Sequence, residues 1–108
     1  MNPDEVVAVG LVDDDLNLCM VLKEELNEVG YDAEAVHNGD EALSYIKDHS
    51  VDLMLLDLKM PVKDGFEVLK EMNEKNIRMK VIVLTAYADV KSAIDSAKLG
   101  ANDFISKP

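Results

Sequence analysis

Five polar side chains that could carry out chemistry stand at the ends of short apolar runs. Asp13 and Asp14 follow VVAVGLV, Asp57 follows LMLL, Thr85 follows VIVL, and Lys107 follows FIS. Carboxylates, a hydroxyl and an ammonium in one pocket could hold a divalent cation and a phosphoryl group, because oxygen ligands and opposite charges stabilise both. Taken singly, each residue has an ordinary explanation as a capping, turn or surface residue. Their joint role depends on the elements that position them.

Short apolar runs alternate with helical patterns along the chain, which is typical of an α/β fold with a parallel sheet. The run 51–56 is apolar except for Asp52 and is bounded by turn residues, so we expect a strand buried on both faces. The run 31–36 is more polar, which predicts an edge strand. The five predicted strands cover residues 6–12, 31–36, 51–56, 80–84 and 102–106.

Four helices are predicted between these strands. Each is preceded by a residue suited to cap a helix N-terminus: Asp15, Asn38, Asp64 and Asp89. Gly30 and Gly100 are placed to end the first and the fourth helix. The spacing of the fourth helix predicts that its inner face carries Val90, Ala93, Ile94 and Ala97.

Composition sets limits on the partners and the compartment. The 108 residues fit one domain, residues 1–108, and 22 acidic against 11 basic residues give a net charge of -11. Such a charge argues against direct binding of nucleic acid or of anionic lipid. Cys19 is the single cysteine, which fits a reducing compartment. The first residues lack the features of a signal peptide, and no apolar run is long enough to span a membrane, so we expect a cytoplasmic protein.

Parallel strands bring their carboxyl ends to one edge of the sheet, so the five polar residues should face one another there. Like charges about 4 Å apart cost about 4 kcal/mol per pair at an effective dielectric of ~20. Lys107 offsets part of this repulsion among Asp13, Asp14 and Asp57, and a divalent cation, with Mg²⁺ favoured, would offset the rest. The alternative is that two of these carboxyl groups are protonated or cap the first helix.

A carboxylate beside a metal, with an ammonium and a hydroxyl close by, indicates phosphoryl chemistry. Asp57 would act as the nucleophile and form an aspartyl phosphate. Lys107 would neutralise charge on the phosphoryl oxygens, and the Thr85 hydroxyl would donate a hydrogen bond to one of them. The chain lacks a glycine-rich cradle of the GxxxxGK type, so the sequence does not support nucleotide binding.

These motifs also resemble a known family. VDDD at 12–15, LLDLKMPVKDG at 55–65, VIVLTAY at 81–87 and GANDFISKP at 100–108 are similar to the receiver domain of bacterial two-component response regulators, which includes chemotaxis regulators. The resemblance covers essentially the whole chain and implies a flavodoxin-like, doubly wound sheet of five parallel strands in the order 2-1-3-4-5. TAYADV resembles the receivers of transcription activators that carry an ATPase domain.

The resemblance also implies roles for single residues. Asp57 would accept the phosphoryl group from a sensor histidine kinase. Mg²⁺ would bind to Asp14, to Asp57, to the backbone carbonyl of Lys59 and, partly through water, to Asp13. Lys107 would precede a cis peptide bond to Pro108. Such a domain is a signalling domain and not an enzyme, because it catalyses only its own phosphorylation and dephosphorylation.

Family members switch through a hydroxyl residue and an aromatic residue, which are Thr85 and Phe104 in this chain. Phosphorylation would draw Thr85 inward and let Phe104 turn in, which alters the surface of the fourth helix and the fifth strand. Alternatively Phe104 is a permanent core residue, because the alternation along 102–106 does not decide which way it faces. Lys59 and Tyr87 lie two residues after Asp57 and Thr85, where their bulk could tune the lifetime of the phosphoryl group.

The chain departs from the family at its end, because receiver domains carry a final helix after the Lys-Pro pair and this sequence stops at Pro108. We expect that the chain is a fragment, that the helix is missing from the sequence, or that another molecule covers the gap. Without the helix, part of one sheet face and the flank bearing Cys19 should be exposed. An output domain or protein beyond Pro108 and a homodimer formed on phosphorylation are the expected partners.

Two rival functions remain. A non-phosphorylated pseudo-receiver would act only as an interaction module, but such a protein would be expected to lose Asp57, Lys107 or the acidic pair. An aspartyl-phosphate hydrolase of the haloacid dehalogenase type would need a second Asp two residues after its nucleophile, where this chain has Lys59. The sequence therefore favours a phosphoacceptor.

Overall fold

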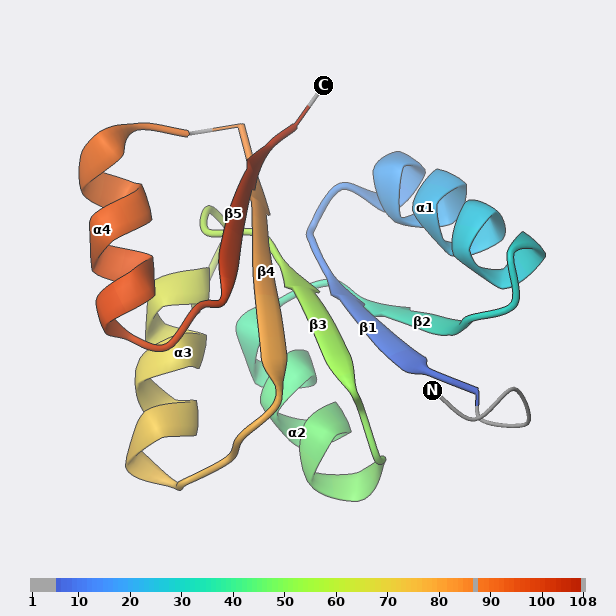
Figure 1. The fold of residues 1–108 in the computed structure, drawn as a ribbon, viewed down its shortest axis with the longest axis horizontal. Coiled ribbons are helices and arrows are strands. Elements are labelled where there is room, and N and C mark those ends of the chain that lie inside the picture. The colour runs from blue at the N-terminus through green and yellow to red at the C-terminus, as the bar shows by residue number, and fades with distance from the viewer. Residues whose placement is uncertain (1–5, 87, 108) are drawn as a thin grey trace.

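The computed structural model describes residues 6–86 and 88–107, which form a five-stranded parallel sheet with helices on both faces (Figure 1). The strand order is β2-β1-β3-β4-β5, which confirms the flavodoxin-like topology and the edge position of the second strand. The strands are β1 (Ala8–Val12), β2 (Asp32–Val36), β3 (Leu53–Leu56), β4 (Lys80–Thr85) and β5 (Asp103–Ser106). The helices are α1 (Leu16–Glu28), α2 (Gly39–Asp48), α3 (Gly65–Glu74) and α4 (Val90–Lys98).

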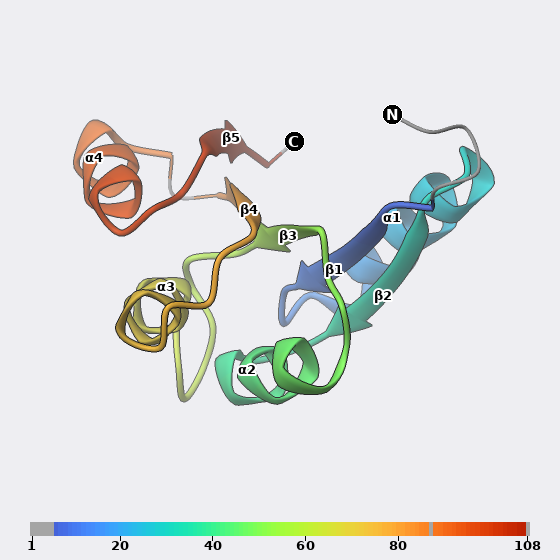
Figure 2. The ribbon, with the colours of Figure 1, turned by 60° about the horizontal axis from the view of Figure 1, so that its bottom comes forward.

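Two hydrophobic layers fix the sheet between the helices (Figure 2). On one face, Met54 and Leu56 of β3 are fully buried against α2 and α3. On the other face, Leu11 of β1 packs with Leu22 and Leu26 of α1. Each buried aliphatic side chain contributes about 1.5–3 kcal/mol. The core beneath the sheet edge is therefore large enough to hold polar groups at the strand ends.

The face of the sheet that carries α1 is only partly covered. Ile82 and Leu84 of β4 are half-buried there, and the side chain of Ile105 in β5 is 46% exposed. Within the described ranges, no helix packs over this part of the sheet (Figure 2). The flank of α1 that bears Cys19 is exposed as expected, because Leu16 and Met20 are 61% and 58% exposed, whereas Cys19 itself is buried beside β1.

The four helices begin after the predicted capping residues, and α1 and α4 end where predicted. Each N-cap side chain accepts a hydrogen bond from a backbone N–H in the first turn, as expected for capping residues: Asp15, Asn38, Asp64 and Asp89. Gly30 and Gly100 follow α1 and α4 with φ angles of 102°, a conformation that glycine adopts without strain. In the part of the chain that the structure describes, no helix is long and apolar enough to cross a membrane.

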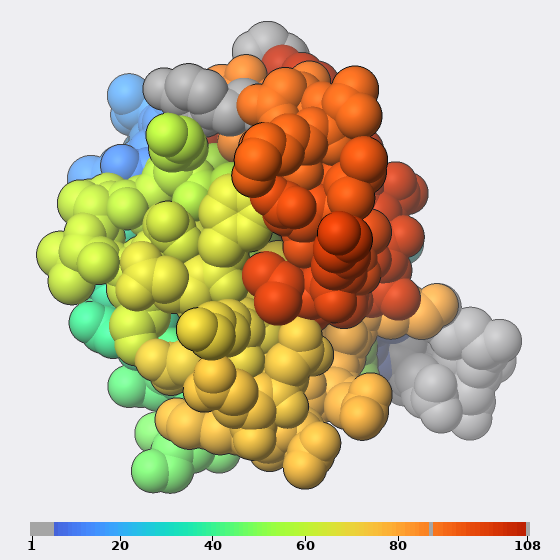
Figure 3. Space-filling view, turned by 90° about the vertical axis from the view of Figure 1, so that its left-hand side faces the viewer, coloured from blue at the N-terminus to red at the C-terminus, as the bar shows by residue number. Residues whose placement is uncertain are grey.

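The predicted inner face of α4 is wrong in part. Val90 and Ile94 are 76% and 50% exposed, whereas Ser96 is buried. The Ser96 hydroxyl donates to the backbone carbonyl of Ala93, so the serine can be buried without an unsatisfied polar group. Of the other two predicted residues, Ala93 is half-buried but Ala97 is exposed. Helix α4 lies beside α3 (Figure 3).

Candidate functional site

The carboxyl ends of four strands meet at one edge of the sheet. Asp13 directly follows β1, Asp57 follows β3, Thr85 ends β4, and Lys107 follows β5. Backbone hydrogen bonds continue the sheet past the strand ends: Asp57 N–H donates to the Val12 carbonyl and Lys107 N–H to the Thr85 carbonyl, both at 2.9 Å. The structure thus brings together the residues that the sequence predicts to face one another.

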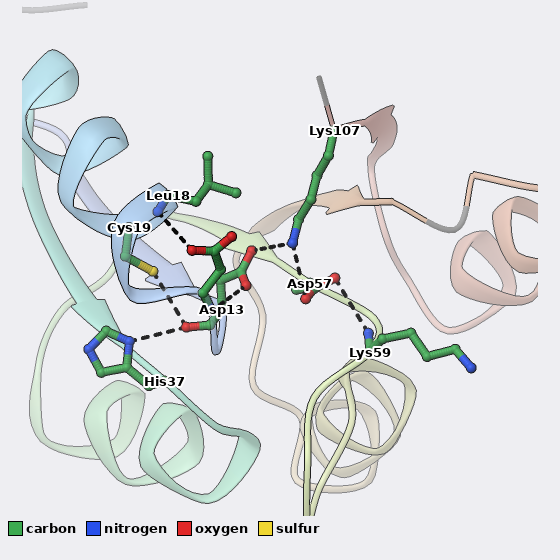
Figure 4. Close-up of polar contacts among 8 residues, drawn as sticks. Asp13, Leu18, Cys19, His37, Asp57, Lys59 and Lys107 are labelled. Atoms are coloured by element: carbon green, nitrogen blue, oxygen red, sulfur yellow. Dashed lines mark hydrogen bonds and ion pairs between the residues drawn. The ribbon is translucent and has the colours of Figure 1, made fainter.

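The ammonium of Lys107 is shared between two carboxylates. Its Nζ lies 2.7 Å from Asp13 Oδ2 and 3.3 Å from Asp57 Oδ2 (Figure 4). The side chains of Lys107, Asp13 and Asp57 are 15%, 8% and 4% exposed, so solvent and salt screen these ion pairs weakly. Lys107 therefore links the ends of β1, β3 and β5.

Asp14 adds a third carboxylate to this group. Asp13, Asp14 and Asp57 each place one oxygen within 4.8 Å of the others, and Asp14 is the exposed member. Two ligands of one Mg²⁺ ion lie up to about 4.2 Å apart, because each bond is about 2.1 Å long. Three hard oxygen donors at this spacing fit such an ion with small side-chain adjustments.

Burial and charge set the protonation of the buried groups. Burial raises the pKa of Asp57 above its ordinary value of 3.8, and the negative charge of Asp13 raises it further. The Lys107 ammonium and the Lys59 N–H, which lies 3.4 Å from Asp57 Oδ1, act in the opposite direction. For Lys107, burial lowers the pKa, but the hydrogen bond to Asp13 and the attraction of both carboxylates outweigh it, and the pKa is raised. Lys107 thus carries its charge at neutral pH. The ionised form of Asp57, by contrast, is disfavoured by burial and by the charge of Asp13.

Two side chains that the sequence analysis did not select hold the backbone of Asp13. Its carbonyl oxygen accepts a hydrogen bond from Cys19 Sγ at 3.4 Å and contacts His37 Nδ1 at 3.1 Å (Figure 4). A carbonyl only accepts, so Nδ1 carries the ring proton. Burial raises the pKa of the Cys19 thiol to about 11, which keeps the thiol protonated and able to donate. No periodic or motif signal links His37 to Asp13, because the contact joins β2 to β1 across the sheet.

An open hollow of about 480 Å³ lies above the carboxylates. The loop after β3 forms one wall of this hollow, and the Lys59 side chain extends away from Asp57 (Figure 4). The Lys59 ammonium is therefore not part of the charged cluster, unlike that of Lys107. The residues that line the hollow are Asp14, Asp15, Asp57, Lys59, Met60, Pro61, Ala86 and Lys107.

The two predicted switch residues share a face of the sheet. Phe104 is in register with Val83, and Thr85 lies two residues after Val83, so all three side chains project to the same side. Thr85 is fully buried and Phe104 is half-buried. The register with β4 thus shows that Phe104 projects to the same face of the sheet as Thr85, which the alternation along 102–106 did not decide. The positions predicted for Tyr87 and for the peptide bond to Pro108 lie outside the described residues.

Comparisons with known proteins agree on one family. A model of the response regulator receiver domain matches residues 9–108. The transcriptional regulatory protein ZraR of Klebsiella oxytoca is 38% identical over 104 residues, which cover 96% of this chain and 24% of that protein. This chain therefore spans about a quarter of the length of that relative.

Solved structures give the same result. A CheY-like response regulator receiver domain protein from Methanospirillum hungatei JF-1 has a TM-score of 0.90 and 31% identity, and the match covers 96% of this chain and 83% of that one. The response regulator protein TrrA from Thermotoga maritima, solved in complex with Mg²⁺-BeF, has a TM-score of 0.84 and 37% identity. That match covers 95% of this chain and 88% of the other.

Replacement of Asp57 by Asn should stabilise the fold at neutral pH. A carboxyl whose pKa is raised on folding keeps its proton longer in the folded state, so stability falls as the pH rises from 3.8 through the raised pKa. Above the raised pKa the whole effect is present, and Asp57→Asn should then raise the free energy of unfolding by about 1–2 kcal/mol. Urea titrations at pH 7 and in steps toward pH 4 should show this gain shrinking as the pH falls.

The matched control is Glu24→Gln, which removes one exposed carboxylate from α1 and thus the same amount of net charge. This variant should leave the free energy of unfolding within about 0.5 kcal/mol of the wild-type value. An Asp57→Asn variant that is no more stable than wild type at pH 7 would contradict the electrostatic description of the site.

Proposed function

The chain belongs to the response regulator receiver domain family of two-component systems, and we propose on this premise that it is a phosphoacceptor switch with Asp57 as the acceptor. The observation that carries the proposal is the Lys107 ammonium, which is shared by Asp13 and Asp57 beside the third carboxylate of Asp14. A nucleophilic carboxylate needs nearby positive charge to approach an anionic phosphoryl group, and this arrangement supplies it.

The donor is the phosphohistidine of a sensor histidine kinase. An Asp57 carboxylate oxygen forms a bond to phosphorus while the phosphorus–nitrogen bond breaks, and the electron pair of that bond stays with the imidazole of the kinase. Lys107 then faces the phosphoryl oxygens in addition to Asp13, and the Thr85 hydroxyl donates to a phosphoryl oxygen. Attack by water later returns the carboxylate and releases phosphate. Such a domain signals, and as an enzyme it catalyses only these two steps on itself.

The donor set fits a Mg²⁺ ion. Asp14 and Asp57 would hold it directly, with the backbone carbonyl of Lys59, and Asp13 would contribute partly through water. A bound Mg²⁺ neutralises charge on the phosphoryl oxygens and so favours transfer to Asp57. The close carboxylate spacing supports this assignment, as does the Mg²⁺ complex of TrrA, a relative at 37% identity.

Phosphorylation changes the surface of α4 and β5. Thr85 moves toward the phosphoryl group, and Phe104, which lies on the same face of the sheet, turns into the space that Thr85 leaves. Because Val90 and Ile94 already expose apolar surface on α4, a change there can alter binding to an output domain beyond Pro108 or to a second copy of the chain. The similarity to the transcriptional regulatory protein ZraR supports a role in transcription regulation. We place the protein in the cytoplasm and, from the resemblance of TAYADV, take an ATPase domain as its output. Because this chain is strongly acidic, we assign any contact with DNA to the output domain.

Incubation with acetyl phosphate and Mg²⁺ tests the acceptor. Intact mass should rise by roughly 80 Da, the mass of one phosphoryl group, and the Asp57→Ala variant should show no gain. Asp52→Ala is a suitable control, because Asp52 lies at the opposite end of β3. A wild-type chain without the mass gain would support the pseudo-receiver, an interaction module that is never phosphorylated.

Lys59 and Tyr87 should tune the lifetime of the phosphoryl group. Lys59 lines the hollow through which water must reach Asp57, and its side chain points away from the acceptor. Lys59→Ala and Tyr87→Ala should each change the dephosphorylation half-life by about threefold or more and leave the extent of phosphorylation unchanged. The decay of the phosphorylated mass after removal of acetyl phosphate measures this. Unchanged half-lives in both variants would refute the role.

A further inference from the structure

Lys63, in the loop between β3 and α3, connects two helices. Its Nζ lies 3.3 Å from Asp40 Oδ1 at the start of α2, and it also pairs with Glu71 of α3. The Lys63 side chain is only 20% exposed, so its stem is packed between the helices. The hydrogen bond from Lys63 lowers the pKa of Glu71, and the same bond raises the pKa of Lys63. Both partners are therefore ionised at neutral pH.

The loop that carries Lys63 has a strained backbone. The N–H of Lys63 donates to the Pro61 carbonyl at 2.9 Å, which closes a three-residue turn around Val62 with a φ of 70°. A β-branched residue adopts this conformation only against steric repulsion. The Val62 side chain is 88% exposed, so its own packing does not hold the turn. Neighbouring contacts must impose this conformation.

Two glycines show how closely the loop fits its surroundings. A Cβ at Gly39, the first residue of α2, would lie 2.6 Å from the Lys63 carbonyl oxygen. A Cβ at Gly65, the first residue of α3, would clash with the Asp57 carbonyl oxygen. Gly65 N–H also donates to the Leu58 carbonyl at 3.0 Å. The loop therefore packs closely against the start of α2 and the end of β3.

We infer that Lys63 is a positioning residue for the phosphoacceptor site. Its ion pairs to Asp40 and Glu71 hold the strained loop in place, and the same loop carries the Lys59 backbone and forms one wall of the hollow beside Asp57. This inference rests on the proposed function, because it assigns the loop a role in holding Mg²⁺. The role is carried by contacts between loop and helices, since Lys63 itself does not touch the carboxylate cluster.

The sign of the effect on Mg²⁺ binding separates positioning from simple electrostatics. Lys63→Met removes a positive charge, which by itself would strengthen the attraction of the chain for a cation. Positioning predicts the opposite, a Mg²⁺ affinity weaker by about fivefold to tenfold, because the loop is free to leave its strained conformation. Calorimetric titration of the chain with MgCl₂ measures the affinity. Phosphorylation by acetyl phosphate should slow by a similar factor at subsaturating Mg²⁺ and recover at saturating Mg²⁺.

Lys75→Met is the matched control. Lys75 also pairs with Glu71, at 3.7 Å, but it lies at the end of α3 and does not belong to the loop. The Lys75→Met variant loses the same charge as Lys63→Met, and its Mg²⁺ affinity should stay within about twofold of wild type. Lys63→Arg should restore most of the affinity, because Arg can reach both carboxylates. Equal affinities in Lys63→Met and Lys75→Met would overturn the inference.

Gly39→Ala provides a second variant that changes no charge. Its new Cβ must displace the loop at Lys63, so it should also weaken Mg²⁺ binding, and it remains informative if Lys63→Met does not fold. Hydrogen exchange of the backbone amides at positions 63 and 65 should become faster in both Lys63→Met and Gly39→Ala. If wild type bound no Mg²⁺ and took up no phosphoryl group, the proposed function would be wrong. Faster exchange in Lys63→Met would then show that the ion pairs of Lys63 only stabilise the loop, which also overturns the positioning role.

Discussion

The ammonium of Lys107, held between two buried carboxylates, is the interaction on which the functional edge of this sheet depends. It joins the ends of β1, β3 and β5, which are separated widely in the sequence. Burying a carboxylate without a partner of opposite charge is costly, and Lys107 supplies that partner to both Asp13 and Asp57. The hydrophobic layers on both faces of β3 supply the free energy that keeps these groups together. The hydrophobic core therefore stabilises the positions of the charged side chains at this edge.

The cluster is electrostatically incomplete. One ammonium stands against three neighbouring carboxylates, and burial first, then repulsion from Asp13, raises the pKa of Asp57. Such a site has a built-in affinity for positive charge, and the hollow above it leaves room for a phosphoryl group. The loop after β3 forms one wall of that hollow, and Lys63 ties the loop to α2 and α3. A change of charge at Asp57 would therefore act directly on this loop.

Much of this arrangement could be predicted from the sequence, because the relevant signals are local. Apolar runs identify the strands, capping residues such as Asp64 locate the helix starts, and parallel topology then gathers Asp13, Asp57 and Lys107. The features that could not be predicted from the sequence depend on how the helices and strands pack against one another. Ser96 is buried because its hydroxyl bonds within its own helix, which the apolar spacing of α4 does not reveal. Likewise, the direction of Phe104 follows from its register with β4.

The dependence of folding stability on Mg²⁺ tests most directly the claim that these carboxylates form a cation site. The free energy of unfolding should be measured by urea titration over a series of MgCl₂ concentrations, with KCl holding the ionic strength constant. Because the ion would bind only the assembled cluster, stability should rise by about 1.4 kcal/mol for each tenfold increase in Mg²⁺ above the dissociation constant. The rise should shrink in Asp14→Asn, which leaves the buried ion pairs intact. A wild-type stability that does not depend on Mg²⁺ would contradict the account.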